Sequence, residues 1–229
     1  MENIFELKEI SKTYGETKAV MVHALRRVDL IIKKGEFTAL IGPSGSGKTT
    51  LLNVMSGLDV PTSGTVLLKG NELSKMTGNE LSDFRRDHIG FVFQSYNLIP
   101  VLTAFENIEY ILILEGVPEA ERKKRVLEIL SEVGLKGLEK KYPAQLSGGQ
   151  QQRVAVARAV VGKADIILAD EPTANLDSVT GRALIDMMLH LNEVHGVTFV
   201  FSTHDQRIMD EAKRIVVIED GKVSDDNGM

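Results

Sequence analysis

A loop that could hold phosphate groups lies at Gly42-Pro43-Ser44-Gly45-Ser46-Gly47-Lys48-Thr49. Its glycines allow backbone N–H groups to point at oxyanions, and Lys48 supplies a cation for the β- and γ-phosphates of a nucleotide. Thr49 supplies a hydroxyl for Mg²⁺. The apolar residues 37–41 predict a strand before the loop, and residues 48–55 predict a helix whose N-terminus faces the same anion. A glycine-rich turn that merely links strand to helix is the alternative, and the Lys-Thr pair argues against it.

Two carboxylates, Asp170 and Glu171, follow another apolar run at residues 166–169. Asp170 fits the acid that holds Mg²⁺ in phosphoryl transfer, usually through a metal-bound water, and Glu171 could polarise the attacking water as a general base. An acidic turn before Pro172 is the structural alternative, which a phosphate loop in the same chain makes weaker. The sequence therefore predicts phosphoryl chemistry as well as nucleotide binding.

A second candidate anion site lies at Leu146-Ser147-Gly148-Gly149-Gln150. Ser147 is placed to cap a helix that continues to Val161, and the two glycines leave the backbone N–H groups at its N-terminus uncovered. One nucleotide cannot readily use two helix N-termini from the same side. We therefore expect each nucleotide to lie between two copies of the chain, with the phosphate loop from one copy and the Ser147 helix from the other.

The elements that must position these residues alternate between apolar strands and helical periodicity, which is typical of an α/β fold. The carboxyl ends of parallel strands meet at one edge of a sheet, and we expect Gly42, Gln94, Asp170-Glu171 and His204 to converge there. Residues 94–162 have a nearly continuous helical pattern and predict an inserted helical subdomain. The predicted strands cover residues 5–10, 25–32, 37–41, 64–68, 89–93, 166–169, 197–201 and 214–218.

Composition limits the classes of protein that this chain can be. Its 229 residues, 43% of them hydrophobic, fit one domain, with residues 1–93 and 163–229 as the core around the helical subdomain. A net charge of −5 gives no general attraction to nucleic acid, and we expect no such partner. The absence of cysteine excludes disulfides and thiolate metal sites and fits a reducing compartment. No export signal or membrane-length apolar segment is visible, so another subunit would have to span a membrane.

These motifs resemble, in order and spacing, those of the ATP-binding-cassette ATPases over essentially the whole chain. The family's phosphate loop matches Gly42 to Thr50, its glutamine loop Gln94, its signature Leu146 to Gln150, and its acidic strand end Asp170-Glu171. Its switch histidine matches His204, its dimer-crossing aspartate loop Ala174-Asn175-Leu176-Asp177, and its adenine-stacking aromatic Tyr14. Without the resemblance, Tyr14 would be expected only to pack against an edge strand, and His204 only to begin a helix.

The resemblance implies an α/β fold with a P-loop NTPase core, an N-terminal antiparallel β subdomain and the inserted helical subdomain. It implies a head-to-tail dimer that closes on two ATP molecules and opens on hydrolysis to drive integral membrane permease subunits. The cofactors would be ATP and Mg²⁺, and the protein would lie at the cytoplasmic side of the plasma membrane through its partners. Lys48, Gln94, Glu171 and His204 would be catalytic, Thr49, Gln94 and Asp170 would organise Mg²⁺, and Tyr14, Ser147 to Gln150 and Asp177 would help to bind nucleotide.

Finer resemblance points to the subgroup that contains the lipoprotein-releasing, macrolide-export and cell-division ATPases, LolD, MacB and FtsE. The matching stretches include residues 24–30, residues 89–94 and the Asn175-Leu176-Asp177 loop, and residues 201–205 look more like the first two members. The apolar side chains after Gln94, namely Tyr96, Leu98 and Ile99, are expected to offer a pocket for a short helix of the membrane partner.

Two other classes of nucleotide-binding protein share part of this pattern. A DNA-repair or chromosome-associated ATPase can carry the same signature, but such relatives usually insert long coiled coils or zinc modules, and this chain has neither such heptads nor cysteine. A small-molecule kinase could use the phosphate loop, but it would give the Ser147 signature no task. The transporter interpretation is therefore favoured, and the sequence leaves the cargo and the direction of transport undefined.

Overall fold

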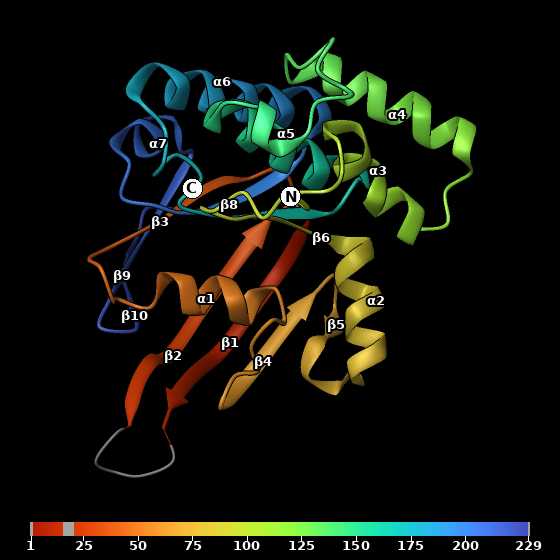
Figure 1. Cartoon of the computed structure of the whole chain (residues 1–229). Helices are drawn as coiled ribbons and strands as arrows, with labels where there is room; N and C mark the ends of the chain where they lie inside the picture. Colours follow the sequence, from red (N-terminus) through yellow and green to blue (C-terminus); the bar gives the residue numbers. More distant parts are fainter. Residues whose placement is uncertain (1, 16–20, 229) are drawn as a thin grey trace.

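The computed structural model describes residues 2–15 and 21–228, whose strands form two sheets (Figure 1). The first sheet is antiparallel, has the strand order β2-β1-β4-β5 and is built from the first part of the chain. This arrangement agrees with the antiparallel β subdomain that the family resemblance implies. The strands are β1 (Asn3–Tyr14), β2 (Val22–Lys33), β4 (Ser63–Leu68) and β5 (Asn71–Glu72).

The second sheet is mixed and carries the predicted site residues at one edge. Its strand order is β10-β9-β3-β8-β7-β6, and all neighbouring strands are parallel except β10, which pairs antiparallel with β9. Because β3, β8, β7 and β6 are consecutive neighbours, the segments that follow them leave the same edge side by side. The strands are β3 (Phe37–Ile41), β6 (Ile89–Val92), β7 (Ile166–Asp170), β8 (Thr198–Ser202), β9 (Arg214–Glu219) and β10 (Lys222–Asp226).

Helix α1 (Lys48–Met55) lies between the two sheets (Figure 1). Its apolar side chains, such as Leu51 and Leu52, pack in one cluster with the antiparallel sheet and with one face of the mixed sheet, including Leu168. Alternate residues of the same strands, such as Ile167, point to the opposite face and join a second cluster. The central strands are thus buried on both faces, as their continuous apolar sequences predict.

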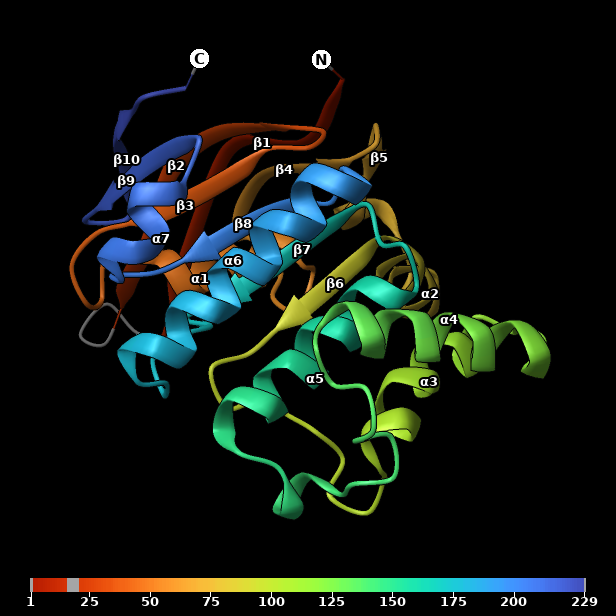
Figure 2. The ribbon, with the colours of Figure 1, turned by 90° about the horizontal axis from the view of Figure 1, so that it is seen from above.

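The helices after residue 103 join the cluster on the far face of the mixed sheet (Figure 2), whereas Leu81 and Phe84, of the helix at residues 78–88, pack against the cluster that contains α1. The apolar side chains of Val126, Ile129, Leu130 and Val133 are buried, as are those on one face of the helix at residues 178–195. No helix among the described residues has the length and apolar character needed to cross a membrane. The helices are α2 (Gly78–His88), α3 (Ala104–Leu114), α4 (Glu119–Glu132), α5 (Gly148–Val161), α6 (Ser178–His195) and α7 (Gln206–Glu211).

The stretch at residues 94–162 is less helical than its pattern predicts. It contains α3, α4 and α5, but residues 93–103 form an extended loop, and residues 133–147 contain only one short 3₁₀ turn. A buried Asn107 side chain stabilises the first loop by hydrogen bonding with the backbone of Ile99, Leu102 and Thr103. Helical periodicity does not report such side-chain-to-backbone bonds, which explains the difference.

Three elements escape the sequence prediction, namely α2, β5 and β10. For α2 a signal exists, because Thr77 and Glu80 form a capping box: the Thr77 hydroxyl accepts from the Glu80 N–H, and the Thr77 N–H donates to the Glu80 carboxylate. The hydrophobic content of α2 is low and none of its residues is fully buried, so an apolar stripe cannot reveal it.

Candidate nucleotide-binding site

A cavity of about 610 Å³ lies at the edge of the mixed sheet where β3, β6, β7 and β8 end. It brings together residues from all four strand exits, as predicted for this edge. Val22, Ala24, Ala174 and Ser202 also line it and were not predicted from the sequence. The predicted site residues in its lining are Tyr14, Gly42, Ser44, Gly45, Gly47, Lys48, Thr49, Thr50, Gln94, Glu171 and His204.

The phosphate loop wraps around the ammonium group of Lys48. Lys48 Nζ donates hydrogen bonds to the carbonyl oxygens of Gly42 at 2.7 Å and Pro43 at 3.0 Å. Gly47 has a φ of 107°, and a Cβ atom there would lie 2.5 Å from the carbonyl oxygen of Ala24, so only glycine fits. The side-chain oxygen of Ser46 is buried, and no group in residues 2–15 or 21–228 forms a hydrogen bond with it. The loop thus holds a cation and an unsatisfied polar group beside a helix N-terminus, which fits an anionic ligand.

Thr49 and Asp170 form the part of the site that fits Mg²⁺. The Thr49 hydroxyl donates to Asp170 Oδ1 at 3.2 Å, although Thr49 follows β3 and Asp170 lies at the end of β7. Among residues 2–15 and 21–228, no group of three or more His, Cys, Asp or Glu side chains is arranged to hold a metal ion. A hydroxyl and a single carboxylate are oxygen ligands that would suit Mg²⁺ bound together with the phosphates of a nucleotide.

Glu171 lines the cavity and contacts His204. Its backbone adopts a left-handed conformation with a φ of 46°, which is uncommon for a side chain other than glycine and is held by a hydrogen bond from its N–H to the carbonyl of Ser202. Oε1 lies 2.8 Å from Nδ1 of His204, whereas Oε2 is buried and has no hydrogen-bond partner among the described residues. The Glu171 side chain is 18% exposed and that of His204 is 74% exposed. One Glu171 oxygen is therefore oriented by His204, and the other is buried and has no exposed surface.

Gln94 lines the cavity, and its loop is fixed from two sides. The side chain of Asn175 donates to the Gln94 carbonyl at 3.0 Å. The Arg158 guanidinium donates to the carbonyls of Tyr96 and Asn97, both of which have positive φ values. These contacts link the glutamine loop to the aspartate loop and to α5, and Arg158 is a residue whose role the sequence did not reveal.

Asp205 fixes the segment that follows His204. It accepts a hydrogen bond from the Thr173 hydroxyl at 2.6 Å and pairs with Arg207. The bonds from Arg207, together with the one from Thr173, outweigh burial and lower the pKa of Asp205 to about 2. Asp205 therefore remains ionised at neutral pH. Its hydrogen bond from Thr173 connects the segment after β8 to the segment after β7, which contains Glu171.

The signature residues do not line this cavity. Ser147 caps α5 in a capping box with Gln150, as predicted. A Cβ atom on Gly148 would lie 2.8 Å from the hydroxyl of Tyr96, and one on Gly149 would lie 2.2 Å from Cγ2 of Thr180. The two glycines therefore also allow close packing inside the chain, a reason for glycine that the sequence interpretation missed.

Asp177 also lies outside the cavity and caps α6. Its carboxylate accepts from the N–H groups of Val179 and Thr180 and from the Thr180 hydroxyl, which lowers the pKa of Asp177. Within one chain, the predicted nucleotide contacts therefore fall into a cavity set and a separate set at the N-termini of α5 and α6.

Two further cavities lie away from this edge. One, of about 370 Å³, forms a groove lined by Ile99, Tyr110, Glu115 and Arg158 among others. Of the three residues expected there, Ile99 alone is in the lining, because Leu98 packs against the core and the Tyr96 hydroxyl faces Gly148.

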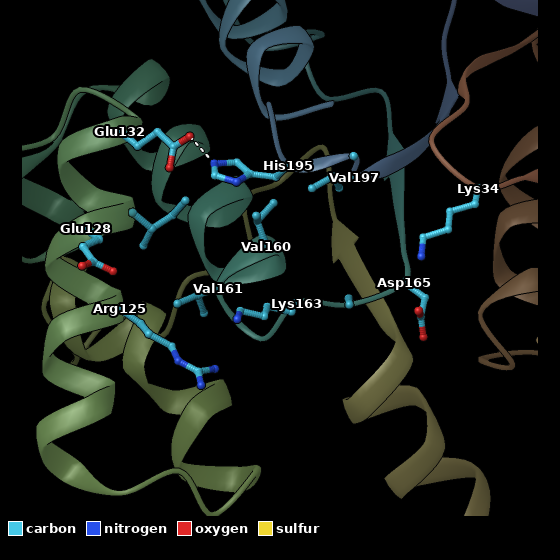
Figure 3. Close-up of a pocket in the computed structure, with 13 residues that line it drawn as sticks. Lys34, Arg125, Glu128, Glu132, Val160, Val161, Lys163, Asp165, His195 and Val197 are labelled. Atoms are coloured by element: carbon cyan, nitrogen blue, oxygen red, sulfur yellow. Dashed lines mark hydrogen bonds and ion pairs between the residues drawn. The ribbon is translucent and has the colours of Figure 1, made fainter. Parts of the chain in front are cut away.

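The other, of about 490 Å³, lies beside α4 and the end of α6 (Figure 3). There the Glu132 carboxylate contacts Nε2 of His195 at 2.6 Å. This cavity contains none of the predicted site residues.

Sequence comparisons agree with the site geometry. The family described as ABC transporter matches residues 25–174, which is more than half of the chain. An uncharacterized ABC transporter ATP-binding protein of Thermotoga maritima is 49% identical over 97% of this chain and 94% of its own length. A macrolide export ATP-binding/permease protein, MacB of Mannheimia succiniciproducens, is 45% identical over 98% of this chain. The chain spans only 34% of that relative.

Structural comparisons give the same result. A dimeric structure of MJ0796, described as a bacterial ABC transporter cassette, has a TM-score of 0.90 and 44% identity, with 98% of each chain covered. A dimeric post-hydrolysis state of MJ0796 bound to ADP and Pi has a TM-score of 0.89 over the same share. Together with the cavity that joins phosphate loop, carboxylates and histidine, these matches show that the chain belongs to the ABC transporter family, as an ATPase domain that uses ATP and Mg²⁺.

Proposed function

We propose that the chain is the ATP-hydrolysing motor of a transporter complex and works as a head-to-tail dimer around two Mg-ATP. The observation that carries this proposal is the division of the nucleotide contacts. The cavity holds the phosphate loop and Glu171, whereas the capped N-terminus of α5 at Ser147 lies outside it. A second copy supplies the missing half by presenting its Ser147 helix to the first copy's phosphate loop.

Binding begins at the phosphate loop. Lys48 gives up its hydrogen bonds to the Gly42 and Pro43 carbonyls and turns its ammonium group to the β- and γ-phosphates. Thr49 and Asp170 would hold Mg²⁺, which would neutralise charge on the phosphate oxygens. Tyr14, at the rim of the same cavity, stacks on the base.

Hydrolysis uses Glu171 as the general base. A water held by Gln94 and by the Glu171 carboxylate gives its proton to that carboxylate, and its oxygen bonds to the γ-phosphorus. The bond between the γ-phosphorus and the bridging oxygen breaks, leaving ADP and phosphate. His204 orients Glu171 through Oε1, contacts the γ-phosphate and links its loss to opening of the dimer.

The partner that the motor drives binds in the groove lined by Ile99, Glu115 and Arg158. Burial lowers the pKa of Arg158 and raises that of Glu115, and no carboxylate pairs with Arg158 among the described residues. A short amphipathic helix fits this groove if it carries an acidic residue for Arg158 and a basic residue for Glu115. Such a helix belongs to a membrane permease subunit, which holds the motor at the cytoplasmic side of the membrane.

Similarity to a macrolide export ATP-binding/permease protein supports export of macrolide- or peptide-type substrates, with lipoprotein release as the other task of the same subgroup. A cell-division role like that of FtsE is the alternative within this subgroup. Purification of the chain from its native membrane, followed by mass spectrometry of the associated subunits, distinguishes these tasks. Recovery of a permease with the chain would support a role in transport, whereas recovery of DNA-repair or chromosome proteins alone would refute that role.

Replacement of Glu171 by Gln tests the hydrolytic mechanism. The amide keeps the size and polarity of the side chain but cannot accept the proton, so we expect turnover to fall by about 10²–10⁴-fold while ATP affinity is retained. The variant should elute as an ATP-dependent dimer because hydrolysis no longer opens it. The control is Glu193→Gln on the exposed side of α6, which should behave as wild type. Unchanged turnover in Glu171→Gln would exclude Glu171 as the base.

A further inference from the structure

Tyr14 is held by two residues that the sequence did not single out. Its hydroxyl donates to Asp59 Oδ2 at 2.5 Å. Lys12 Nζ donates to Asp59 Oδ1 at 2.5 Å and to the carbonyl of Val60 at 2.7 Å. The same ammonium lies 4.8 Å from the centroid of the Tyr14 ring. Asp59 thus accepts hydrogen bonds from both the Tyr14 hydroxyl and the Lys12 ammonium.

This cluster is shielded from water although the ring itself is exposed. The Lys12 and Asp59 side chains are 13% and 26% exposed, whereas Tyr14 as a residue is 40% exposed. Burial disfavours ionised Asp59, but hydrogen bonds from Lys12 and Tyr14 outweigh it and lower the pKa of Asp59. Burial and the bond to Asp59 raise the pKa of Tyr14. At neutral pH the carboxylate is therefore ionised and the phenol keeps its proton, so the hydrogen bond persists.

The Tyr14 ring belongs both to this cluster and to the cavity. Tyr14 lines the nucleotide cavity, whereas Lys12 and Asp59 are not among its lining residues. The ammonium lies over the ring, where it makes a cation–π contact. A flat ligand such as a purine base in the cavity would stack on the ring face that the ammonium leaves uncovered.

We infer that Asp59 and Lys12 are positioning residues that fix the Tyr14 ring as a preformed platform for the base of ATP. This inference rests on the proposed nucleotide site and adds residues to it. An exposed tyrosine otherwise loses rotamer freedom when a ligand orders it, which weakens binding. Because the hydrogen bond orders the ring in advance, Asp59 contributes to base affinity without touching the phosphates or the reacting water.

The test compares ATP with inorganic tripolyphosphate, which has the phosphates but no base. In the full chain, Asp59→Ala should raise the KM for ATP by about 3- to 10-fold, the effect of one ordered side chain, and leave kcat within about twofold. The inhibition constant of tripolyphosphate should not change. A merely structural role of Asp59 would weaken both ligands or lower kcat, and either result would overturn the inference.

Tyr14→Phe provides a second, independent variant. It keeps the ring for stacking and removes only the hydroxyl that bonds to Asp59, so we expect the same selective rise in the KM for ATP. Adding Asp59→Ala to Tyr14→Phe should cause little further change in the KM for ATP, because both substitutions remove the same hydrogen bond. An unchanged KM in Tyr14→Phe would overturn the inference even if Asp59→Ala fails to fold.

The wild-type chain separates this inference from the proposed function. If wild type hydrolyses ATP, Glu171→Gln does not, and Tyr14→Phe leaves the KM unchanged, then the motor proposal survives and the platform is wrong. If wild type fails to hydrolyse ATP, the proposed function itself fails.

Discussion

Gly149 lies at the contact between α5 and α6, and Gly149→Ala tests whether this packing requires glycine. The new Cβ atom would lie 2.2 Å from Cγ2 of Thr180, far inside van der Waals contact. Thr180 cannot simply rotate, because its hydroxyl donates to Asp177 Oδ2 at 2.6 Å. Either the helices separate or this hydrogen bond is lost. The contact therefore couples the signature helix to the aspartate loop.

The expected loss of stability in Gly149→Ala follows from these two alternatives. Overpacking typically costs about 1–3 kcal/mol, and loss of a hydrogen bond costs about 1 kcal/mol. Alanine recovers about 0.5–1 kcal/mol of helix propensity. We therefore expect Gly149→Ala to lower the free energy of unfolding by about 1–2 kcal/mol, equivalent to a fall in Tm of about 2–8 °C.

Urea unfolding measures the effect, and a second substitution identifies its cause. Thr180→Ser removes the methyl group that the new Cβ meets and keeps the hydroxyl, so the double variant should recover most of the lost stability. Gly78→Ala is the control, because a Cβ atom there meets nothing within 4 Å. A Gly149→Ala variant as stable as wild type, or a double variant without recovery, would refute the reasoning.

Three other substitutions have expected outcomes. The folded-state pKa of Asp205 is about 2, against an ordinary value of 3.8, so its ionisation stabilises the fold above about pH 4 and this contribution is lost as pH falls toward 2. Asp205→Asn should therefore lower the free energy of unfolding by about 2 kcal/mol at pH 7. In urea unfolding, this difference from wild type should shrink by about 1 kcal/mol between pH 5 and pH 3. A difference that stays constant with pH would contradict the low pKa of Asp205. Glu115→Lys should abolish stimulation of the ATPase by the membrane partner and leave the unstimulated rate unchanged, and full stimulation would exclude a role for this groove charge. Asn107→Leu leaves buried backbone groups without partners and should lower the free energy of unfolding by about 2–4 kcal/mol. Calorimetry measures this as a lower Tm, and a Tm equal to that of wild type would contradict the role of Asn107.

Much of the site could be predicted because it depends on local sequence and on parallel-sheet topology. The phosphate loop, Glu171 and His204 each follow a buried strand, and such strands have continuous apolar sequences that are easily recognised. Once the strands are parallel neighbours, their carboxyl ends must meet, and the residues after them share one cavity.

The residues that escaped prediction act through contacts between distant parts of the chain. Asp59 meets Tyr14 across 45 positions of sequence, and Arg158 reaches the glutamine loop across about 60. No periodicity or motif in the sequence indicates which residue either of them contacts. The loops at residues 93–103 and 133–147 escaped for the same reason, since polar side chains such as Asn107 fix them through backbone bonds.

The central claim is that each nucleotide lies between two copies, and mixing two inactive variants tests it most directly. Lys48→Ala removes the phosphate contact of one half-site, and Ser147→Arg blocks the other half-site. Each variant alone should be inactive. A mixed dimer regains one complete site, so an equimolar mixture should recover up to about a quarter of the wild-type ATPase rate. Full activity of Ser147→Arg alone, or a mixture no more active than its parts, would contradict the account.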